Sequence, residues 1–446
     1  MNATYQHAVV LGLGASGVAA ARLLRAEGTA ITVLEREVSP AMEASRRELA
    51  SLGIQVVVGE GGLPPDPFDV CVVSPGVPVT SPWPMEAQAR GIPRLAELEL
   101  GWSRRGPATK VVAVTGSNGK SNAVKWMTEA LAEAGYAVAL GGNYGPPVCR
   151  VVHEHRHLDW LVLEVSSFQL ETIRTFRAEL GILLNLVPNH LDRHGDLETY
   201  RAAKARLFAH LQPGDVALIH EECSAWLPPA PPGVTWRSFG RSAACDYRYQ
   251  AGRVERGAQV LADLSGSYFG NEVLGVNAAG ILGALDEGGL NVEAAVRVAQ
   301  VFRPLPHRME TVAEARGIRF VNDSKATTLA ALSAAVRMCG GKVRLIAGGL
   351  LKEKDLTAAK EVLAQHAAGV YLIGKASEPM ASAWSEVTRC VKCDTLATAA
   401  ETAWREAQPG ETILLSPGCA SFDQFRNFEE RGERFRQAAR ALAGET

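Results

Sequence analysis

The middle of this chain contains the glycine-rich stretch Thr115-Gly116-Ser117-Asn118-Gly119-Lys120-Ser121. It follows the apolar run Val111 to Val114, which predicts a buried strand, and it precedes a segment with a helical pattern. Glycines at such a turn let backbone N–H groups face phosphate oxygens, and the N-terminus of the helix adds partial positive charge. Lys120 would reach the terminal phosphates and Ser121 would ligate Mg²⁺. The stretch predicts a phosphate loop rather than a plain strand-to-helix turn, although Val114 replaces the first glycine of the full motif.

A second glycine-rich stretch, Gly12-Leu13-Gly14-Ala15-Ser16-Gly17, has the spacing of a dinucleotide-binding turn. It follows the apolar run His7 to Leu11, and Glu35 ends the next predicted strand, where an acid can hydrogen-bond a ribose hydroxyl. A bound NAD-type cofactor is one interpretation. Because the same turn accepts any pyrophosphate with a ribose attached, a UDP-sugar is the other, and the fold alone does not decide between them.

Polar residues follow two later strands of the middle segment. Glu164 ends an apolar run that begins at Trp160, and a carboxylate there could hold Mg²⁺ directly or through water. His190 and Asp192 follow the next predicted strand, Leu180 to Leu186. Carboxylate and imidazole groups gathered at the carboxyl ends of strands suit a metal-phosphate site.

Four other polar or sulfur-bearing residues have plainer interpretations. His194 is expected to be solvated in its loop, and spacing alone indicates that Lys204 is a surface lysine on a helix. Cys390 and Cys393 form a lone CxxC, without a second pair or nearby histidines, which is poor evidence for zinc.

Asn322-Asp323-Ser324-Lys325-Ala326-Thr327 directly follows the first apolar run of the last third of the chain, Ile318 to Val321. Asp323 could bind ribose hydroxyls, and Lys325 could meet a phosphate or carboxylate. Ahead of this block, Arg308 stands at a proline-containing junction, where an arginine could reach ATP.

Strands alternate with helices along the chain, and short uninterrupted apolar runs indicate parallel sheets covered on both faces. The pattern restarts twice, which predicts three α/β domains over residues 1–97, 98–305 and 306–446. The first and third are expected to be Rossmann-like and the central one a parallel sheet of the P-loop ATPase type.

Composition excludes several classes of protein. The 446 residues carry a formal net charge of −2 with no basic stripe, so no nucleic-acid partner is expected. No apolar run reaches the length of a membrane span, and the start of the chain lacks the pattern of a signal peptide. Eight scattered cysteines are expected to be reduced thiols, so we expect a cytoplasmic protein without membrane insertion.

Together these motifs resemble the Mur ligase family over almost the whole chain. The resemblance rests on the phosphate loop, on Leu163-Glu164-Val165-Ser166-Ser167-Phe168-Gln169-Leu170 and on the block at 322–327. It also rests on Leu415-Ser416-Pro417-Gly418-Cys419-Ala420-Ser421-Phe422-Asp423-Gln424-Phe425, followed by Asn427-Phe428-Glu429 and Arg431-Gly432. The four blocks occur in the family's order and are most similar to its glutamate-adding branch.

The resemblance implies a role for each matching position. Lys204 aligns with a lysine that the family carries as a carbamate, and a carbamate can hold Mg²⁺ together with Ser121, Glu164 and His190. Lys120, His190 and Lys204 are the implied catalytic residues. The other implied contacts are with ATP (Gly116, Ser117, Asn118, Gly119, Lys120, Ser121, Asn277, Arg308, Asp323), with the UDP-sugar (Gly14, Ala15, Ser16, Glu35, Ser74, Asn143) and with glutamate (Lys325, Thr327, Lys352, Ser421, Phe428).

Three positions depart from the family's pattern. Asn122 stands where threonine is usual, and Val276 where histidine is common. Leu350-Leu351 replaces the Asp-Gly usually found before the lysine that corresponds to Lys352, which leaves the glutamate enantiomer open.

The reaction implied by the resemblance is ATP-dependent addition of glutamate, with the D-enantiomer expected, to UDP-N-acetylmuramoyl-L-alanine through an acyl phosphate, by a monomer in peptidoglycan synthesis. One rival is a ligase of the same architecture with another acceptor, such as L-glutamate, or one of the folylpolyglutamate synthase type. The other rival is an NAD-dependent oxidoreductase, which leaves the phosphate loop unexplained.

Overall fold

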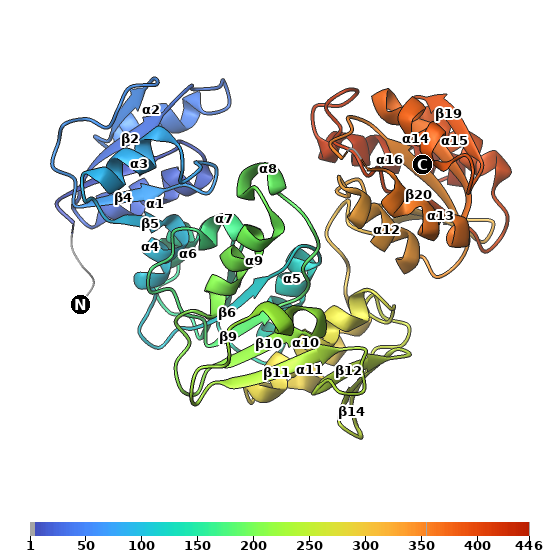
Figure 1. Cartoon of the computed structure of the whole chain (residues 1–446), viewed down its shortest axis with the longest axis horizontal. Coiled ribbons are helices and arrows are strands. Elements are labelled where there is room, and N and C mark those ends of the chain that lie inside the picture. The colour runs from blue at the N-terminus through green and yellow to red at the C-terminus, as the bar shows by residue number, and fades with distance from the viewer. Residues whose placement is uncertain (1–4, 354, 446) are drawn as a thin grey trace. The chain divides into compact units, whose positions relative to one another are not determined.

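The computed structural model describes residues 5–353 and 355–445, and these residues form three separate sheets, each with its own helices (Figure 1). The described chain divides into two compact units. The first holds the chain through Tyr249 together with Val254–Asp263 and Val276–Ala299, and the second holds Gln250–Arg253, Leu264–Gly275 and the chain from Gln300 onward. The expected α/β architecture is confirmed, while the domain limits at 97 and 305 stay predictions.

The first sheet has the strand order β3-β2-β1-β4-β5, and its strand pairs are parallel. The order reverses beside β1, so the turns after β1 and β4 are neighbours at the carboxyl edge, where open α/β sheets bind ligands. Its elements are β1 (His7–Leu11), α1 (Ala15–Ala26), β2 (Ala30–Glu35), α2 (Glu43–Ser51), β3 (Gln55–Val58), β4 (Val70–Val73), α3 (Pro82–Ala89) and β5 (Arg94–Ala96).

Helix α4 (Glu97–Ser103) leads from the first sheet to the second and packs against α1 and α6 (Val148–Glu154). Gly101 permits this close approach, since a Cβ there would lie 2.6 Å from the backbone nitrogen of Cys149. Glu97 and Glu99 are buried at 1% and 3% exposure. Glu97 Oε1 accepts a hydrogen bond from the Cys149 N–H at 2.7 Å, and Glu99 Oε1 accepts one from the Thr175 hydroxyl at 2.8 Å. These two buried carboxyl groups fasten the connecting helix to α6 and to the loop that contains Thr175.

The second sheet has the order β14-β13-β12-β11-β10-β9-β6-β8-β7, with parallel pairing from β7 through β12. The phosphate-loop strand β6 is flanked by β8 and β9, so their carboxyl ends meet. The strands are β6 (Lys110–Thr115), β7 (Val138–Gly142), β8 (Trp160–Glu164), β9 (Leu180–Leu183), β10 (Val216–His220), β11 (Thr235–Gly240), β12 (Tyr247–Gln250), β13 (Arg253–Arg256) and β14 (Gln259–Asp263). The further helices are α5 (Lys120–Glu133), α7 (Ser167–Leu170), α8 (Leu191–His194), α9 (Leu197–Ala205), α10 (Leu274–Glu287) and α11 (Val292–Val301).

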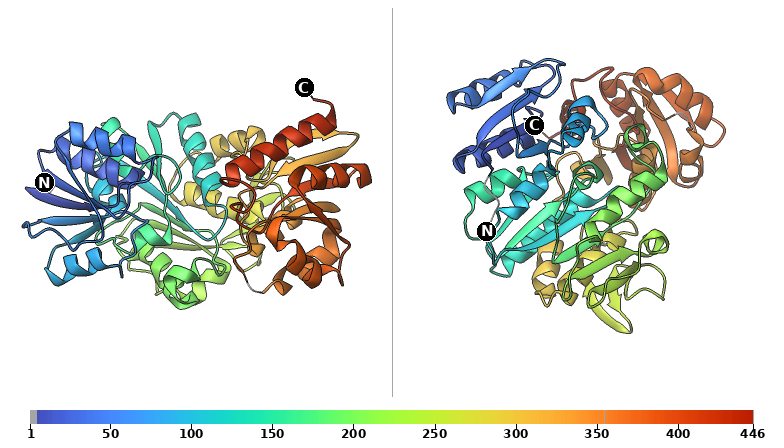
Figure 2. Two further views of the ribbon diagram at one scale, coloured as in Figure 1. Left: turned by 90° about the horizontal axis from the view of Figure 1, so that it is seen from above. Right: turned by 60° about the vertical axis from the view of Figure 1, so that its left-hand side comes forward.

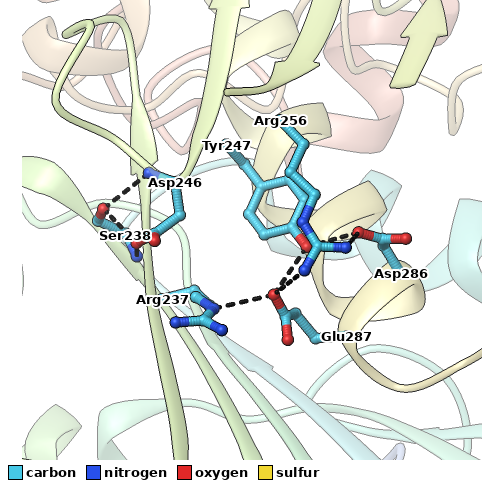
Figure 3. A network of polar contacts seen from close by, with 7 residues as sticks. All are labelled: Arg237, Ser238, Asp246, Tyr247, Arg256, Asp286 and Glu287. Carbon is cyan, nitrogen blue, oxygen red and sulfur yellow. Dashed lines mark hydrogen bonds and ion pairs between the residues drawn. The ribbon is translucent and has the colours of Figure 1, made fainter. Parts of the chain in front are cut away.

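A polar network ties the outer strands of this sheet to the end of α10 (Figure 3). The buried Tyr247 hydroxyl donates to Asp286 Oδ2 at 2.6 Å and lies 3.0 Å from Glu287 Oε1. Arg256 contacts the same two carboxylates at 2.8 and 3.2 Å, and Arg237 Nε reaches Glu287 at 2.9 Å. The network holds the helix whose opposite end carries Asn277.

The third sheet has the order β15-β16-β20-β17-β18-β19, and only β15 runs antiparallel to its neighbour among the described strands. The loops after β16, β20 and β17 are therefore adjacent. Figure 2 shows α16, in red, beside this sheet. Its elements are β15 (Glu310–Ala315), β16 (Ile318–Asn322), α12 (Leu329–Met338), β17 (Val343–Gly348), α13 (Lys360–His366), β18 (Ala367–Ile373), α14 (Ser377–Trp384), β19 (Cys390–Asp394), α15 (Leu396–Glu406), β20 (Thr412–Leu415) and α16 (Phe428–Ala443).

Within the described part of the chain, no helix is both long and apolar enough to cross a membrane. The cysteines of this part are all free, and seven of the eight are buried. Cys390 and Cys393 both lie on β19, and no group of three or more His, Cys, Asp or Glu side chains that could hold a metal ion occurs among the described residues.

Candidate active site

The backbone of the loop between β6 and α5 is shaped by Gly119 and fixed by hydrogen bonds to Asn185. Gly119 caps α5 with φ 85°, and a Cβ there would lie 2.4 Å from Nδ2 of Asn277. Asn185 fastens the loop from the side, since its Oδ1 accepts from the Asn118 N–H at 2.8 Å and its Nδ2 donates to the Asn118 carbonyl at 2.9 Å. Only glycine fits both the left-handed backbone and this close approach at position 119.

Two lysine side chains converge on one carbonyl of this loop. Lys120 Nζ donates to Gly116 O at 2.8 Å and to Ser117 O at 3.0 Å, and Lys204 Nζ donates to Gly116 O at 2.8 Å. Lys204 is 1% exposed, so the expectation of a surface lysine is wrong. Burial, reinforced by the positive charge of Lys120, holds the pKa of Lys204 well below its usual value. Lys204 is therefore biased toward the neutral amine.

Ser121, Glu164 and Asn143 form a chain of hydrogen bonds beside the lysines. The Ser121 hydroxyl donates to Glu164 Oε2 at 2.6 Å, and Asn143 Nδ2 donates to Glu164 Oε1 at 2.6 Å. Ser121 and Glu164 are each 2% exposed. A hydroxyl and a carboxylate on a phosphate loop are oxygen donors that Mg²⁺ accepts alongside phosphate and water. The donor set fits a magnesium ion bound mainly through its nucleotide.

The loop with His190 packs against α7 through the ring of Phe168. His190 caps α8 in the left-handed region with φ 55°, and its ring lies 5.0 Å from that of Phe168. The guanidinium of Arg193 stacks on the same ring at 4.0 Å. His194 is 8% exposed and its Nε2 lies 2.9 Å from the Ser167 hydroxyl, so the expectation of a solvated histidine is wrong. Asp192 has a side chain outside the described set.

The first sheet brings its predicted ligand residues to one edge. Gly14 caps α1, whose first residues are Ala15 and Ser16. Glu35 binds this turn itself, because its Oε2 accepts from the Leu13 N–H at 2.7 Å and its Oε1 from the Arg36 N–H at 2.8 Å. Ser74 is 7% exposed, and its Oγ has no hydrogen-bond partner among the described residues. A buried, unpartnered hydroxyl beside the glycine-rich turn suits a bound polar ligand.

Asp323 and Arg308 lie together in the second unit. Asp323 Oδ1 accepts from the Met309 N–H at 3.2 Å and Oδ2 from the Ser416 hydroxyl at 3.0 Å. Burial raises the pKa of Asp323 to about 7. His307 and Met309, on either side of Arg308, have φ values of 63° and 50°. Non-glycine residues in this region store strain, which is common at functional sites. Asp323 thus holds a strained segment that presents Arg308.

The residues predicted for glutamate come from the adjacent loops after β16, β17 and β20. Lys325 Nζ lies 3.8 Å from the centre of the Phe428 ring, at the start of α16. Ser421 is 3% exposed, Thr327 is half-buried and Lys352 is exposed. The loops after β17 and β20 are joined by a bridge between Leu350 and Ala420. The N-terminus of α12 follows Thr327 directly and adds a site of partial positive charge.

The predicted residues therefore form separate groups. The first unit holds the UDP-sugar residues at its first sheet and the phosphate loop with Asn143, Glu164, Lys204 and Asn277 at its second. Asn277 Oδ1 lies 3.4 Å from Nδ2 of Asn185. The second unit holds Arg308, Asp323 and the residues predicted for glutamate.

Sequence reasoning missed several residues that shape these groups. Tyr200 is 1% exposed and its hydroxyl lies 3.1 Å from that of Ser117. Arg431 is fully buried and donates to the carbonyls of Ser324 and Cys419 at 2.8 and 3.0 Å, which joins two loops of the third sheet. Asn185 could have been found, since it is a polar residue directly after a buried strand. Tyr200 and Arg431 lie on helices, and although Arg431 belongs to a stretch that carries the family resemblance, the sequence does not indicate which segments either side chain contacts.

Comparison with known proteins supports one family throughout. The family models described as "Mur ligase MurD-like, N-terminal domain", "Mur ligase middle domain" and "Mur ligase, glutamate ligase domain" match residues 6–95, 114–261 and 307–419. The UDP-N-acetylmuramoylalanine--D-glutamate ligase of Nitratidesulfovibrio vulgaris is 38% identical over 441 residues, covering 98% of this chain and 96% of that protein. The protein of the same name from Acidobacterium capsulatum is 36% identical over 451 residues, with 98% and 96% coverage.

Solved structures show the same fold at low sequence identity. The MurF ligase of Thermotoga maritima in complex with ADP is 16% identical, with a TM-score of 0.65 and coverage of 93% of this chain and 95% of that one. FolC of E. coli in complex with ADP is 19% identical, with a TM-score of 0.54 and coverage of 77% and 93%.

Proposed function

This chain belongs to the Mur ligase family, and we propose that it joins D-glutamate to UDP-N-acetylmuramoyl-L-alanine at the expense of ATP. The observation that carries the proposal is the cluster of Lys120, Ser121, Glu164 and the buried Lys204 around one phosphate loop. The relatives of high coverage, which carry the name of a D-glutamate ligase, support the choice of substrates.

In the proposed reaction the alanine carboxylate attacks the γ-phosphate of ATP, which gives an acyl phosphate and ADP. The amine of glutamate then attacks the acyl carbon, phosphate leaves, and the amine loses a proton. Lys120, at the start of α5, would stabilise the charge that spreads over the transferring phosphoryl group. Because a carboxylate is a weak nucleophile, holding it in line should supply much of the rate increase.

Ser121, Glu164, His190 and a carbamylated Lys204 are the residues proposed to hold Mg²⁺. The ion would neutralise phosphate charge when bound. A neutral amine adds CO₂ through its nitrogen lone pair and releases one proton to become a carbamate anion, so the lowered pKa of Lys204 favours this modification. Asn143, bonded to Glu164 at 2.6 Å, would face the alanine end of the sugar nucleotide.

For ATP, the proposed contacts are the phosphate loop, Asn277, Arg308 and Asp323. Since both carboxylate oxygens of Asp323 accept hydrogen bonds from the protein, its contribution would include presenting Arg308. For the UDP group, the proposed contacts are Gly14, Ala15, Ser16, Glu35 and Ser74. The unpartnered Ser74 hydroxyl is the strongest of these, because a ligand oxygen would supply its missing partner.

The proposed contacts of the glutamate carboxylates are Lys325, Lys352, Thr327 and Ser421. Phe428, whose ring packs under Lys325, completes the proposed glutamate site. Lys325 and the N-terminus of α12 give this region positive charge. Leu350 keeps the bridge to Ala420, with N–H to carbonyl distances of 2.8 and 3.0 Å, so the leucine pair leaves the loop's backbone pairing intact. We extend the proposal to a cytoplasmic monomer.

The proposal is tested by phosphate release from ATP and UDP-N-acetylmuramoyl-L-alanine, with D-glutamate, with L-glutamate or with no amino acid. Release that depends on D-glutamate is expected. Release only with L-glutamate would overturn the acceptor assignment, and no release with either enantiomer would overturn the function.

A further inference from the structure

Arg193 lies on α8, the helix that follows His190, and it contacts both the loop that follows β4 and the end of α7. Its Nη1 donates to the carbonyl of Pro75 at 2.6 Å, next to Ser74. Its Nη2 and Nε donate to the two carboxylate oxygens of Glu171 at 2.7 and 3.3 Å. The side chains of Arg193 and Glu171 are 14% and 13% exposed. A guanidinium can make all these contacts at once because its donors form a planar fork, which a lysine lacks.

The Arg193 side chain also packs on the ring of Phe168, and the ring of His190 packs on that of Phe168. Arg193 stacks on Phe168 at 4.0 Å, and the His190 ring meets the edge of Phe168 at 5.0 Å. His194, one residue further on α8, is anchored by Ser167 at 2.9 Å and lies 3.7 Å from Glu171. Helix α8 has only four residues, so its position depends on these side-chain contacts rather than on its own backbone bonds.

We propose that Arg193 is a positioning residue that couples the loop at Ser74 to His190, so that binding of the sugar nucleotide orders the catalytic loop. This inference rests on the proposed function and adds a residue to it. A ligand that bonds Ser74 restrains Pro75, and Pro75 restrains α8 through Arg193. The loop at Ser74 has supports of its own, since Ser74 N–H donates to Leu11 O at 3.1 Å and Val77 N–H to Ser74 O at 2.9 Å.

The test compares R193A with R104A as a matched control. Arg104 also makes a two-pronged ion pair, with Glu27 at 3.1 and 3.2 Å, but it joins the end of α4 to α1, away from the Ser74 and His190 loops. R193A is expected to lower kcat by about 10- to 100-fold, as loss of a residue that orients a catalytic ligand does. It should also weaken UDP binding in calorimetry, because a coupling between the two loops acts in both directions. R104A is expected to lower the melting temperature and to keep kcat.

Three outcomes would overturn the proposal: an unchanged kcat in R193A, equal losses of kcat in the two variants, or a raised KM for the sugar nucleotide with kcat intact. R193K should recover little of the lost kcat, because a lysine ammonium lacks the planar set of donors with which the guanidinium bonds Pro75 and Glu171 together.

A second readout does not need turnover. Addition of UDP to the unaltered protein should slow hydrogen exchange of the amides in Leu191–His194, and R193A should abolish that effect. Exchange rates in Leu191–His194 that are the same with and without UDP in both proteins would contradict the coupling. Absence of ligase activity in the unaltered protein, with the exchange effect present, would instead contradict the proposed function.

Discussion

At the scale of single residues, the main finding is a pair of lysines that share one carbonyl. Lys204 is almost fully buried, and its neighbours include the cation of Lys120. A buried ammonium with a second ammonium beside it is unfavourable, which explains why the pKa of Lys204 lies well below its usual value. The position of Lys204 favours carbamylation, which would replace the ammonium by an anionic carbamate.

The first prediction concerns this lysine. K204R places a permanent positive charge at this position and offers no amine that can add CO₂, so kcat should fall at least as much as on loss of a residue that supports a metal ligand, about 10- to 100-fold. Isotopically labelled bicarbonate should give a carbamate signal by nuclear magnetic resonance in the unaltered protein and none in K204R. K392R, at a side chain that is 50% exposed, should keep full activity. Full activity in K204R would show that no carbamate is needed.

The sequence predicts single residues well where a backbone motif demands them. The phosphate loop needs glycine at 119 for its left-handed turn, so the motif carries its own structure. Local sequence alone indicates solvated side chains at His194 and Lys204, which is wrong because burial depends on segments distant in sequence. Ser167 covers His194, and the carbonyl of Gly116 receives Lys204.

At the scale of elements, α10 is fixed by charges at its C-terminal end. The second prediction is that Y247F lowers the free energy of unfolding by about 2 kcal/mol, because a buried hydroxyl bonded to carboxylates is lost. Urea unfolding measures the change. Y136F is the control, since Tyr136 is 37% exposed and should change stability by less than about 0.5 kcal/mol. Equal stability of Y247F and the unaltered protein would contradict the anchoring role.

The third prediction concerns pH and the connecting helix α4. Burial raises the pKa of Glu97 from 4.5 to about 7. Between these values the folded state holds a proton that the unfolded state has lost, so this group makes the free energy of unfolding fall as pH rises. E97Q removes the titration and should flatten that fall between pH 4.5 and 7, as urea unfolding at several pH values would show. E378Q, at a side chain that is 78% exposed, should keep the slope. An unchanged slope in E97Q would rule out Glu97 as its source.

Buried parallel strands are the elements that the sequence predicts best, because their apolar runs are continuous. The strand expected over 180–186 ends at Leu183, since Asn185 turns away to bond the phosphate loop. The sequence does not predict strand β15, because this edge strand has only two buried residues, the adjacent Val312 and Ala313, and a register shift interrupts its pairing with β16. Edge strands carry weaker patterns than central ones.

At the scale of the whole molecule, each of the described sheets places its candidate residues on loops at the carboxyl ends of neighbouring strands. Strand order explains this, since Glu164 ends β8 beside β6 and Asp323 follows β16 beside β20. The restarts of the strand–helix pattern made the three sheets predictable. The contacts that join segments distant in sequence, such as Arg193 with Pro75 or Arg431 with Ser324, were not predictable from one sequence.

The fourth prediction traces one oxygen atom of the alanine carboxylate through the proposed reaction. If the alanine carboxylate is activated by phosphoryl transfer, one of its oxygens leaves with the phosphate when glutamate attacks. The most direct measurement therefore uses UDP-N-acetylmuramoyl-L-alanine with heavy oxygen in that carboxylate, together with ATP and D-glutamate. Mass spectrometry of the products should find heavy oxygen in the released phosphate and glutamate joined to the sugar nucleotide. Phosphate without heavy oxygen, or a sugar nucleotide without added glutamate, would contradict the account.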